Sequence, residues 1–188
     1  MRRLILAEPG GDLDATLDPA AIPAAPSALS ASILASAEKI KTGDIEGALE
    51  NFFDGIDGDG AWRRLPPASK QQLRDNVFTL IGQVHERRKP FSKADAQAIL
   101  TPTLFIGGAD TTGHLPAVTR SLAPNISGAR TAMIAGARHW MFEHAPEQYC
   151  KLVMQVFGGV IFASAPATLL ANRAAATRTE HARRRKFR

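Results

Sequence analysis

Two side chains in the second half of the sequence carry groups suited to proton transfer: the carboxylate of Asp110 and the imidazole of His139. An imidazole accepts a proton from a nucleophile near neutral pH and later returns it to a leaving group. The ring needs a carboxylate beside it, which fixes its tautomer and stabilises its protonated form. Asp110 and His139 therefore predict a general base with an orienting acid, provided that the fold brings them together.

The segments around these two residues predict a parallel sheet with helical crossovers. Short apolar runs ended by glycine are typical of strands, and spacings of three and four residues are typical of helices. In chain order the segments are a strand at 101–108, a helix at 114–126, a strand at 129–136 and a helix at 145–159. Asp110 and His139 each follow a strand, at the end where open parallel sheets bind their ligands. We therefore expect both residues at one edge of the sheet.

The part of the chain before residue 101 predicts one further strand and several helices. Residues 3–7 (RLILA) form a short apolar run that ends at Pro9 and Gly10, and residues 9–27 are typical of a long loop. Helical spacing then indicates helices at 27–41, 45–56 and 69–88, with another starting after Ser92; Asp44 and Ser92 are the expected N-caps.

Residues 99–157, from ILTPTLF to LVMQVF, resemble the C-terminal half of the α/β-hydrolase superfamily. In that family a TPTL strand leads to an acid loop, a helix follows, and a loop of the GARH type carries the catalytic histidine. A following PE pair then opens the last helix. The segment RLILAEPGG similarly resembles the strand that follows the nucleophile helix in a branch of bacterial hydrolases.

The resemblance implies a role for several residues. His139 would be the catalytic base and Asp110 the acid that orients it, with Asp110 standing one position before the usual acid position. Glu8 is the reserve candidate for the acid, because some members of the superfamily carry it at the end of an earlier strand. We expect Trp140 to pack around His139, and His144 to make a local polar contact.

The nucleophile of the superfamily has no counterpart in the sequence. It lies on a strained G-x-S-x-G turn that precedes the acid and the histidine, and no such motif occurs here. Ser127 lacks the leading glycine and follows the acid strand, and Cys150 lies in a helical pattern typical of a core thiol. Because strand 3–7 would leave an open sheet edge, we expect either a partner chain that supplies the missing strands or a truncated gene product.

These observations predict a partial α/β-hydrolase-like parallel sheet with an inserted helical cap. The predicted parts are a strand and loop at 1–26, the cap at 27–100, the core with the acid and histidine loops at 101–158, and an Ala/Arg-rich tail at 159–188. The resemblance implies hydrolysis of a small hydrophobic ester by a Ser-His-Asp mechanism in the complete family member, with this chain alone inactive. The alternative is a non-catalytic interaction protein of the same fold.

Composition and charge indicate a globular protein of the cytoplasm. The single cysteine excludes an internal disulfide, and the first residues lack an apolar run long enough for a secretory signal. The last sixteen residues carry seven Arg/Lys and one Glu, so the net charge of +5 belongs to the tail. Binding of nucleic acid or anionic lipid by that tail is a minor alternative. The uncharged span 152–172 contains glycine and polar residues, so we do not expect it to cross a membrane. We likewise expect no membrane and no nucleic acid among the partners of this protein.

No residue pattern predicts a metal or a cofactor. Residues 54–60 (DGIDGDG) resemble part of a calcium loop, but the position that requires a bidentate Glu holds Pro66. We expect a solvated turn there instead. A phosphate-binding glycine loop is also missing from the sequence. We therefore expect no metal and no cofactor.

Overall fold

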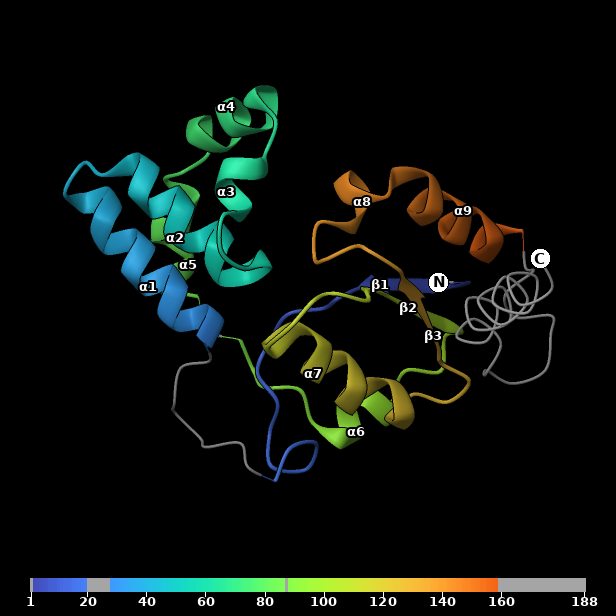
Figure 1. Cartoon of the computed structure of the whole chain (residues 1–188). Helices are drawn as coiled ribbons and strands as arrows, with labels where there is room; N and C mark the ends of the chain where they lie inside the picture. Colours follow the sequence, from blue (N-terminus) through green and yellow to red (C-terminus); the bar gives the residue numbers. More distant parts are fainter. Residues whose placement is uncertain (1, 20–27, 87, 159–188) are drawn as a thin grey trace, which may run out of the picture.

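Three parallel strands form the sheet of the protein (Figure 1). The computed structural model describes residues 2–19, 28–86 and 88–158, so the predicted tail at 159–188 lies outside the described residues. The strands are β1 (Leu4–Ala7), β2 (Thr103–Gly108) and β3 (Arg130–Ile134), in the spatial order β1-β2-β3. The three predicted strands and their parallel pairing are thereby confirmed.

Helices cover both faces of this sheet. One face carries α8 (Met141–His144) and α9 (Pro146–Phe157), and the other carries α6 (Lys93–Gln97), α7 (His114–Leu122) and the short 3₁₀ helix η1 (Ala123–Asn125) (Figure 1). The central strand β2 directs Leu104 and Ile106 towards α9, and Phe105 towards α7. A strand that is covered on both faces needs a continuous apolar run, which explains the sequence TLFIGG.

The first strand, β1, lies at an edge of the sheet. Within the described ranges it pairs only with β2, in a register that places Ala7 beside Ile106. All four of its residues are half-buried. The outer side of β1 therefore presents backbone N–H and C=O groups beside which another strand could pair.

Helices α1 to α5 form a helical unit (residues 28–84) with a core of its own (Figure 1). Their bounds are α1 (Ala28–Lys41), α2 (Ile45–Asp57), α3 (Ala61–Arg64), α4 (Pro67–Asp75) and α5 (Thr79–Val84). The rings of Phe53 and Trp62 lie in that core, with centroids 5.6 Å apart. Trp140, which directly precedes α8, packs on Phe53 with a centroid distance of 5.1 Å. This aromatic contact joins the helical unit to the sheet.

The prediction of one continuous helix at 69–88 is wrong. The chain forms α4 and α5 instead, because the backbone hydrogen bonds between them join residues three positions apart, as in a turn, and not four apart, as in an α-helix. The N–H of Asn76 donates to the carbonyl of Leu73, and the N–H of Thr79 donates to that of Asn76. Asn76 also donates from its side chain to the Gln72 carbonyl, which competes with a regular helix.

The helix α6 belongs to the sheet rather than to the helical unit. Ala96 of α6 is buried in the same core as Phe105 and Val118, although the predicted cap extends to residue 100. The expected N-caps are confirmed: Asp44 accepts the N–H of Gly47, and Ser92 accepts that of Asp95.

No helix in the described part of the chain is long and apolar enough to cross a membrane. Most of the uncharged span 152–172 lies outside the described residues, as does the basic end of the chain.

Replacing Phe105 by alanine should lower the free energy of unfolding by about 3–5 kcal/mol, because its fully buried ring would leave a cavity between β2 and α7. Urea titrations followed by circular dichroism measure the loss. Phe78→Ala is the matched control: that ring is 65% exposed, and its removal should change stability by about 0.5 kcal/mol or less. Equal losses in the two variants would contradict the assigned core.

Candidate active site

His139 lies in a short loop between β3 and α8, the histidine loop (residues 135–140), and its ring contacts the carboxylate of Glu8. His139 Nδ1 is 3.0 Å from Glu8 Oε2. A carboxylate only accepts hydrogen bonds, so Nδ1 carries the proton and donates it to Glu8. The Glu8 side chain is 1% exposed and that of His139 is 24% exposed. The structure thus contains an imidazole whose tautomer is fixed by a buried carboxylate.

The position of Glu8 directly after β1 is fixed by three hydrogen bonds. Its N–H donates to the Ile106 carbonyl at 3.0 Å, and its Oε1 accepts the N–H of Gly108 at 2.9 Å. Its other carboxylate oxygen binds His139. The backbone of Glu8 has a positive φ of 40°, a conformation that costs a side-chain-bearing residue about 1–3 kcal/mol. Strain of this kind persists where surrounding contacts determine the conformation, and it is concentrated at functional sites.

Asp110, the preferred acid in the sequence analysis, does not contact His139. Its N–H donates to the Ala137 carbonyl at 3.0 Å, while its side chain is exposed and makes no hydrogen bond to any described residue. Both loops reach the same edge of the sheet, as expected. The chain turns immediately after Gly108, however, so the Asp110 side chain faces solvent. The structure pairs His139 with the reserve candidate, Glu8.

Glycine at position 108 allows the histidine loop to lie against the end of β2. A Cβ atom there would be 2.4 Å from the carbonyl oxygen of Ala137 and 2.6 Å from that of Arg138, both too short for any real contact. The glycine pair that ends the predicted strand therefore has a structural role beyond stopping it. Any side chain at this position would displace the loop that carries His139.

Asp57, the last residue of α2, also holds the histidine loop, and sequence reasoning did not identify it. Its Oδ1 accepts the backbone N–H of His139 at 2.9 Å, and its carbonyl accepts a hydrogen bond from the guanidinium of Arg138 at 2.5 Å. The residue is 4% exposed, so the expectation of a solvated turn is wrong for Asp57. The only signal was that an acidic residue stood at the end of an otherwise apolar helix face.

His144 makes the local polar contact that the sequence predicted. Its Nδ1 accepts the backbone N–H of Arg138 at 3.4 Å, and its Nε2 lies 3.8 Å from Asp57 Oδ2. Trp140 packs around the site as expected, with its ring centroid 6.0 Å from that of His139.

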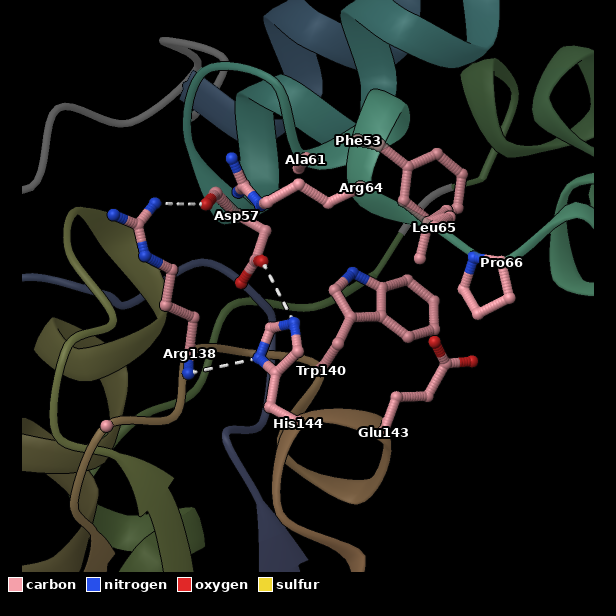
Figure 2. Close-up of a pocket in the computed structure, with 11 residues that line it drawn as sticks. Phe53, Asp57, Ala61, Arg64, Leu65, Pro66, Arg138, Trp140, Glu143 and His144 are labelled. Atoms are coloured by element: carbon pink, nitrogen blue, oxygen red, sulfur yellow. Dashed lines mark hydrogen bonds and ion pairs between the residues drawn. The ribbon is translucent and has the colours of Figure 1, made fainter.

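A pocket of about 520 Å³ lies where the helical unit meets the histidine loop (Figure 2). One wall is apolar and consists of Phe53, Ala61, Leu65, Pro66 and Trp140; the other lining residues are Asp57, Arg64, Gly136, Arg138, Glu143 and His144. The indole N–H of Trp140 is buried and has no hydrogen-bond partner among the described residues. The pocket therefore combines an apolar wall with charged groups, and it adjoins the histidine loop without His139 or Glu8 among its lining residues.

The two candidate nucleophiles do not lie beside His139. Ser127 is exposed in the turn before β3, and the histidine loop leaves the opposite end of that strand. Cys150 is exposed on α9 and not in the core, because α9 packs on the sheet through Leu152, Val153 and Val156 instead. In the described residues no partner is hydrogen-bonded to His139 Nε2, and no cluster of side chains suited to a metal ion is found.

Gly108→Ala should destabilise the protein by about 1–3 kcal/mol and displace the histidine loop, because its methyl group would overlap two carbonyl oxygens. Chemical unfolding gives the stability, and the NMR signals of His139 report the loop. Gly82→Ala is the matched control: no atom lies within 4 Å of its added Cβ, and it lies in α5. It should raise stability by up to about 1 kcal/mol. A stable Gly108→Ala variant with unchanged His139 signals would contradict the role given to Gly108.

The sequence matches no protein-family model and no curated protein. Solved structures do match. An α/β-hydrolase enzyme from a Medee basin deep-sea metagenome library superposes with a TM-score of 0.61 at 16% identity, covering 90% of this chain and 59% of that chain. The enol-lactonase from Burkholderia xenovorans gives 0.60 at 18% identity, over 84% and 56%. The carboxylesterase CesB from Bacillus subtilis gives 0.57 at 15% identity, over 84% and 52%.

The three structures agree in their fold and in the share of their length that this chain covers. It spans little more than half the length of each of the three structures. Its parallel strands and flanking helices are those expected from the resemblance in the sequence. The protein has the fold of part of an α/β-hydrolase.

Proposed function

We propose that this chain supplies the base and the acid of a hydrolase that cleaves a small apolar ester or a related carbonyl compound. His139 is the base, Glu8 is the acid that orients it, and a serine from outside this sequence is the nucleophile. The observation that carries the proposal is the hydrogen bond between His139 Nδ1 and the buried Glu8 carboxylate. This is the arrangement that a histidine needs to act as a general base.

The chemistry follows from the tautomer of His139. Because Nδ1 donates to Glu8, Nε2 carries a lone pair and accepts the proton of the serine hydroxyl as that oxygen attacks the ester carbonyl. The negative charge of Glu8 stabilises the imidazolium that forms. His139 Nε2 then returns the proton to the leaving alcohol, and the acyl group remains on the serine oxygen. A water molecule, deprotonated by His139 in its turn, attacks this acyl-serine ester and releases the acid product and the free serine.

The open edge of β1 is the place where the missing part would join. Glu8 follows the carboxyl end of β1, and β1 has no strand on its outer side in the described residues. A strand added parallel to β1 would end beside Glu8 and His139, so a serine in the turn after that strand would be near the base. Either a partner chain or further sequence of the same protein would supply it.

The apolar wall of the pocket supports an apolar substrate. Its aromatic and aliphatic groups bind hydrocarbon more favourably than charge. The structural neighbours include proteins described as a carboxylesterase and an enol-lactonase, both of which act on esters. A small hydrophobic ester is therefore the substrate class that we propose.

The chain alone should hydrolyse p-nitrophenyl butyrate no faster than buffer, because the described residues bring no nucleophile to His139. His139→Ala should give the same background rate. Release of nitrophenolate, followed by its absorbance, measures both. If turnover occurs and is lost in His139→Ala, the claim of an external nucleophile is wrong, and Ser127 and Cys150 should be tested next.

Adding the missing part should produce turnover that depends on the Glu8–His139 pair. The segment of the Burkholderia xenovorans enol-lactonase that this chain does not cover is a suitable donor, co-expressed or fused before residue 1. Glu8→Gln should then lower kcat by about 10³–10⁴-fold, because the amide no longer fixes the correct tautomer of His139.

Asp110→Asn is the matched control for Glu8→Gln, since it neutralises an exposed carboxylate of the neighbouring loop. It should change kcat by less than about threefold, the scale of a weak surface charge effect. A large loss in Asp110→Asn with none in Glu8→Gln would reverse the assignment of the acid. A folded complex without His139-dependent turnover would favour the non-catalytic interaction protein.

A further inference from the structure

We infer that Asp57 is a positioning residue for His139: it holds the backbone of the proposed base from the helical unit, while Glu8 holds its ring from the sheet. The inference rests on the proposed function in that His139 is the residue being positioned. The inference goes beyond the proposed function in one respect: the helical unit, through the Asp57 carboxylate, helps to position the base as well as to line the pocket.

The contacts of Asp57 are directed at two consecutive residues of the histidine loop. Its Oδ1 accepts the N–H of His139 at 2.9 Å, and its carbonyl accepts the Arg138 guanidinium at 2.5 Å. The Asp57 side chain is only 2% exposed. A buried carboxylate is costly unless its oxygens accept hydrogen bonds, so the position of the His139 N–H and the burial of Asp57 depend on each other.

The direction of the His139 ring depends on the orientation of its backbone. In His139 the N–H and the Cα–Cβ bond are separated by a single rotatable bond, N–Cα, so a hydrogen bond that fixes the N–H also limits where the ring can point. The ring must place Nδ1 within hydrogen-bond distance of Glu8 Oε2, and misplacement of a catalytic group by about 1 Å can cost about 100-fold in rate. Trp140 also joins the loop to Phe53, but apolar packing holds a distance and not the direction of an N–H.

The other charged groups around Asp57 come from the histidine loop, from α8 and, within the helical unit, from Arg64. His144 Nδ1 accepts the N–H of Arg138, so its Nε2 carries a proton and faces Asp57 Oδ2 at 3.8 Å. Figure 2 shows Arg138 and His144 on one side of Asp57, with Arg64 beside it in the helical unit. The Arg64 guanidinium donates to the Asp59 carbonyl. Asp57 thus accepts hydrogen bonds from two residues of the loop, Arg138 and His139.

The experiment is NMR spectroscopy of the full chain with ¹⁵N-labelled histidine, because it observes the site without requiring turnover. The ¹⁵N shifts give the fraction of His139 in the Nδ1–H tautomer, and hydrogen exchange gives the protection of its backbone N–H. In Asp57→Ala the N–H of His139 should exchange about 10- to 100-fold faster, the scale of a lost hydrogen bond to a charged group. The Nδ1–H tautomer should fall from the dominant form to a mixture.

Two further variants separate positioning from a merely structural role. Asp57→Asn keeps an oxygen that accepts the His139 N–H, so it should retain the tautomer and most of the protection. Asp59→Ala removes an exposed carboxylate from the same turn and should change neither signal. The amide signals of β2 and β3 show in each variant whether the sheet is intact.

Several outcomes would overturn the inference. In an intact sheet, an unchanged tautomer and unchanged protection in Asp57→Ala would mean that Asp57 merely fastens the helical unit. Equal losses in Asp57→Asn and Asp57→Ala would mean that charge, and not the accepted hydrogen bond, holds the loop. If Asp57→Ala does not fold, the unaltered chain decides: exchange of the His139 N–H at the rate of an unprotected amide would refute the contact. None of these readings depends on whether the chain hydrolyses esters, so failure of the proposed function would be recognised separately.

Discussion

The carboxylate of Glu8 is almost fully buried at the end of β1, and a buried charge is tolerated only where donors surround it. The register that places Ala7 beside Ile106 brings the N–H of Gly108 to one of its oxygens, and the histidine loop brings the imidazole of His139 to the other. The loop can come this close because residue 108 has no side chain. The register of β1 and β2, the glycine at position 108 and the conformation of the histidine loop are therefore all needed to supply the hydrogen bonds of the Glu8 carboxylate.

A second buried carboxylate, that of Asp57, contacts the same loop from the helical unit. Glu8 contacts the ring of His139, and Asp57 contacts its backbone N–H. The rings of Phe53 and Trp140 pack on each other at this junction and join the helical unit to the histidine loop. Each carboxylate binds residues that are far from it in the sequence. The geometry of the site therefore depends on the sheet and the helical unit being folded together.

Much of the fold was predictable from local patterns in the sequence. The strands, their parallel order and most helices follow from apolar periodicity, and the N-caps at Asp44 and Ser92 follow from residue type. The break between α4 and α5 is not predicted, because the apolar spacing runs on through Asn76 while the side chain of that residue donates to the Gln72 carbonyl. Periodicity reports which residues are buried, and it does not report a local change in hydrogen bonding.

The sequence by itself determined that Glu8, Asp110 and His139 would each follow a strand at the carboxyl edge of a parallel sheet, because strand ends and the loops after them are encoded locally. It also carried the resemblance through which the fold could be named. Only the tertiary structure decided that His139 contacts Glu8 and not Asp110, and that Asp57 is buried against the loop. The direction of a side chain beyond a strand end is set by the register of the neighbouring strand and by what packs over it, and both are contacts between residues far apart in the chain.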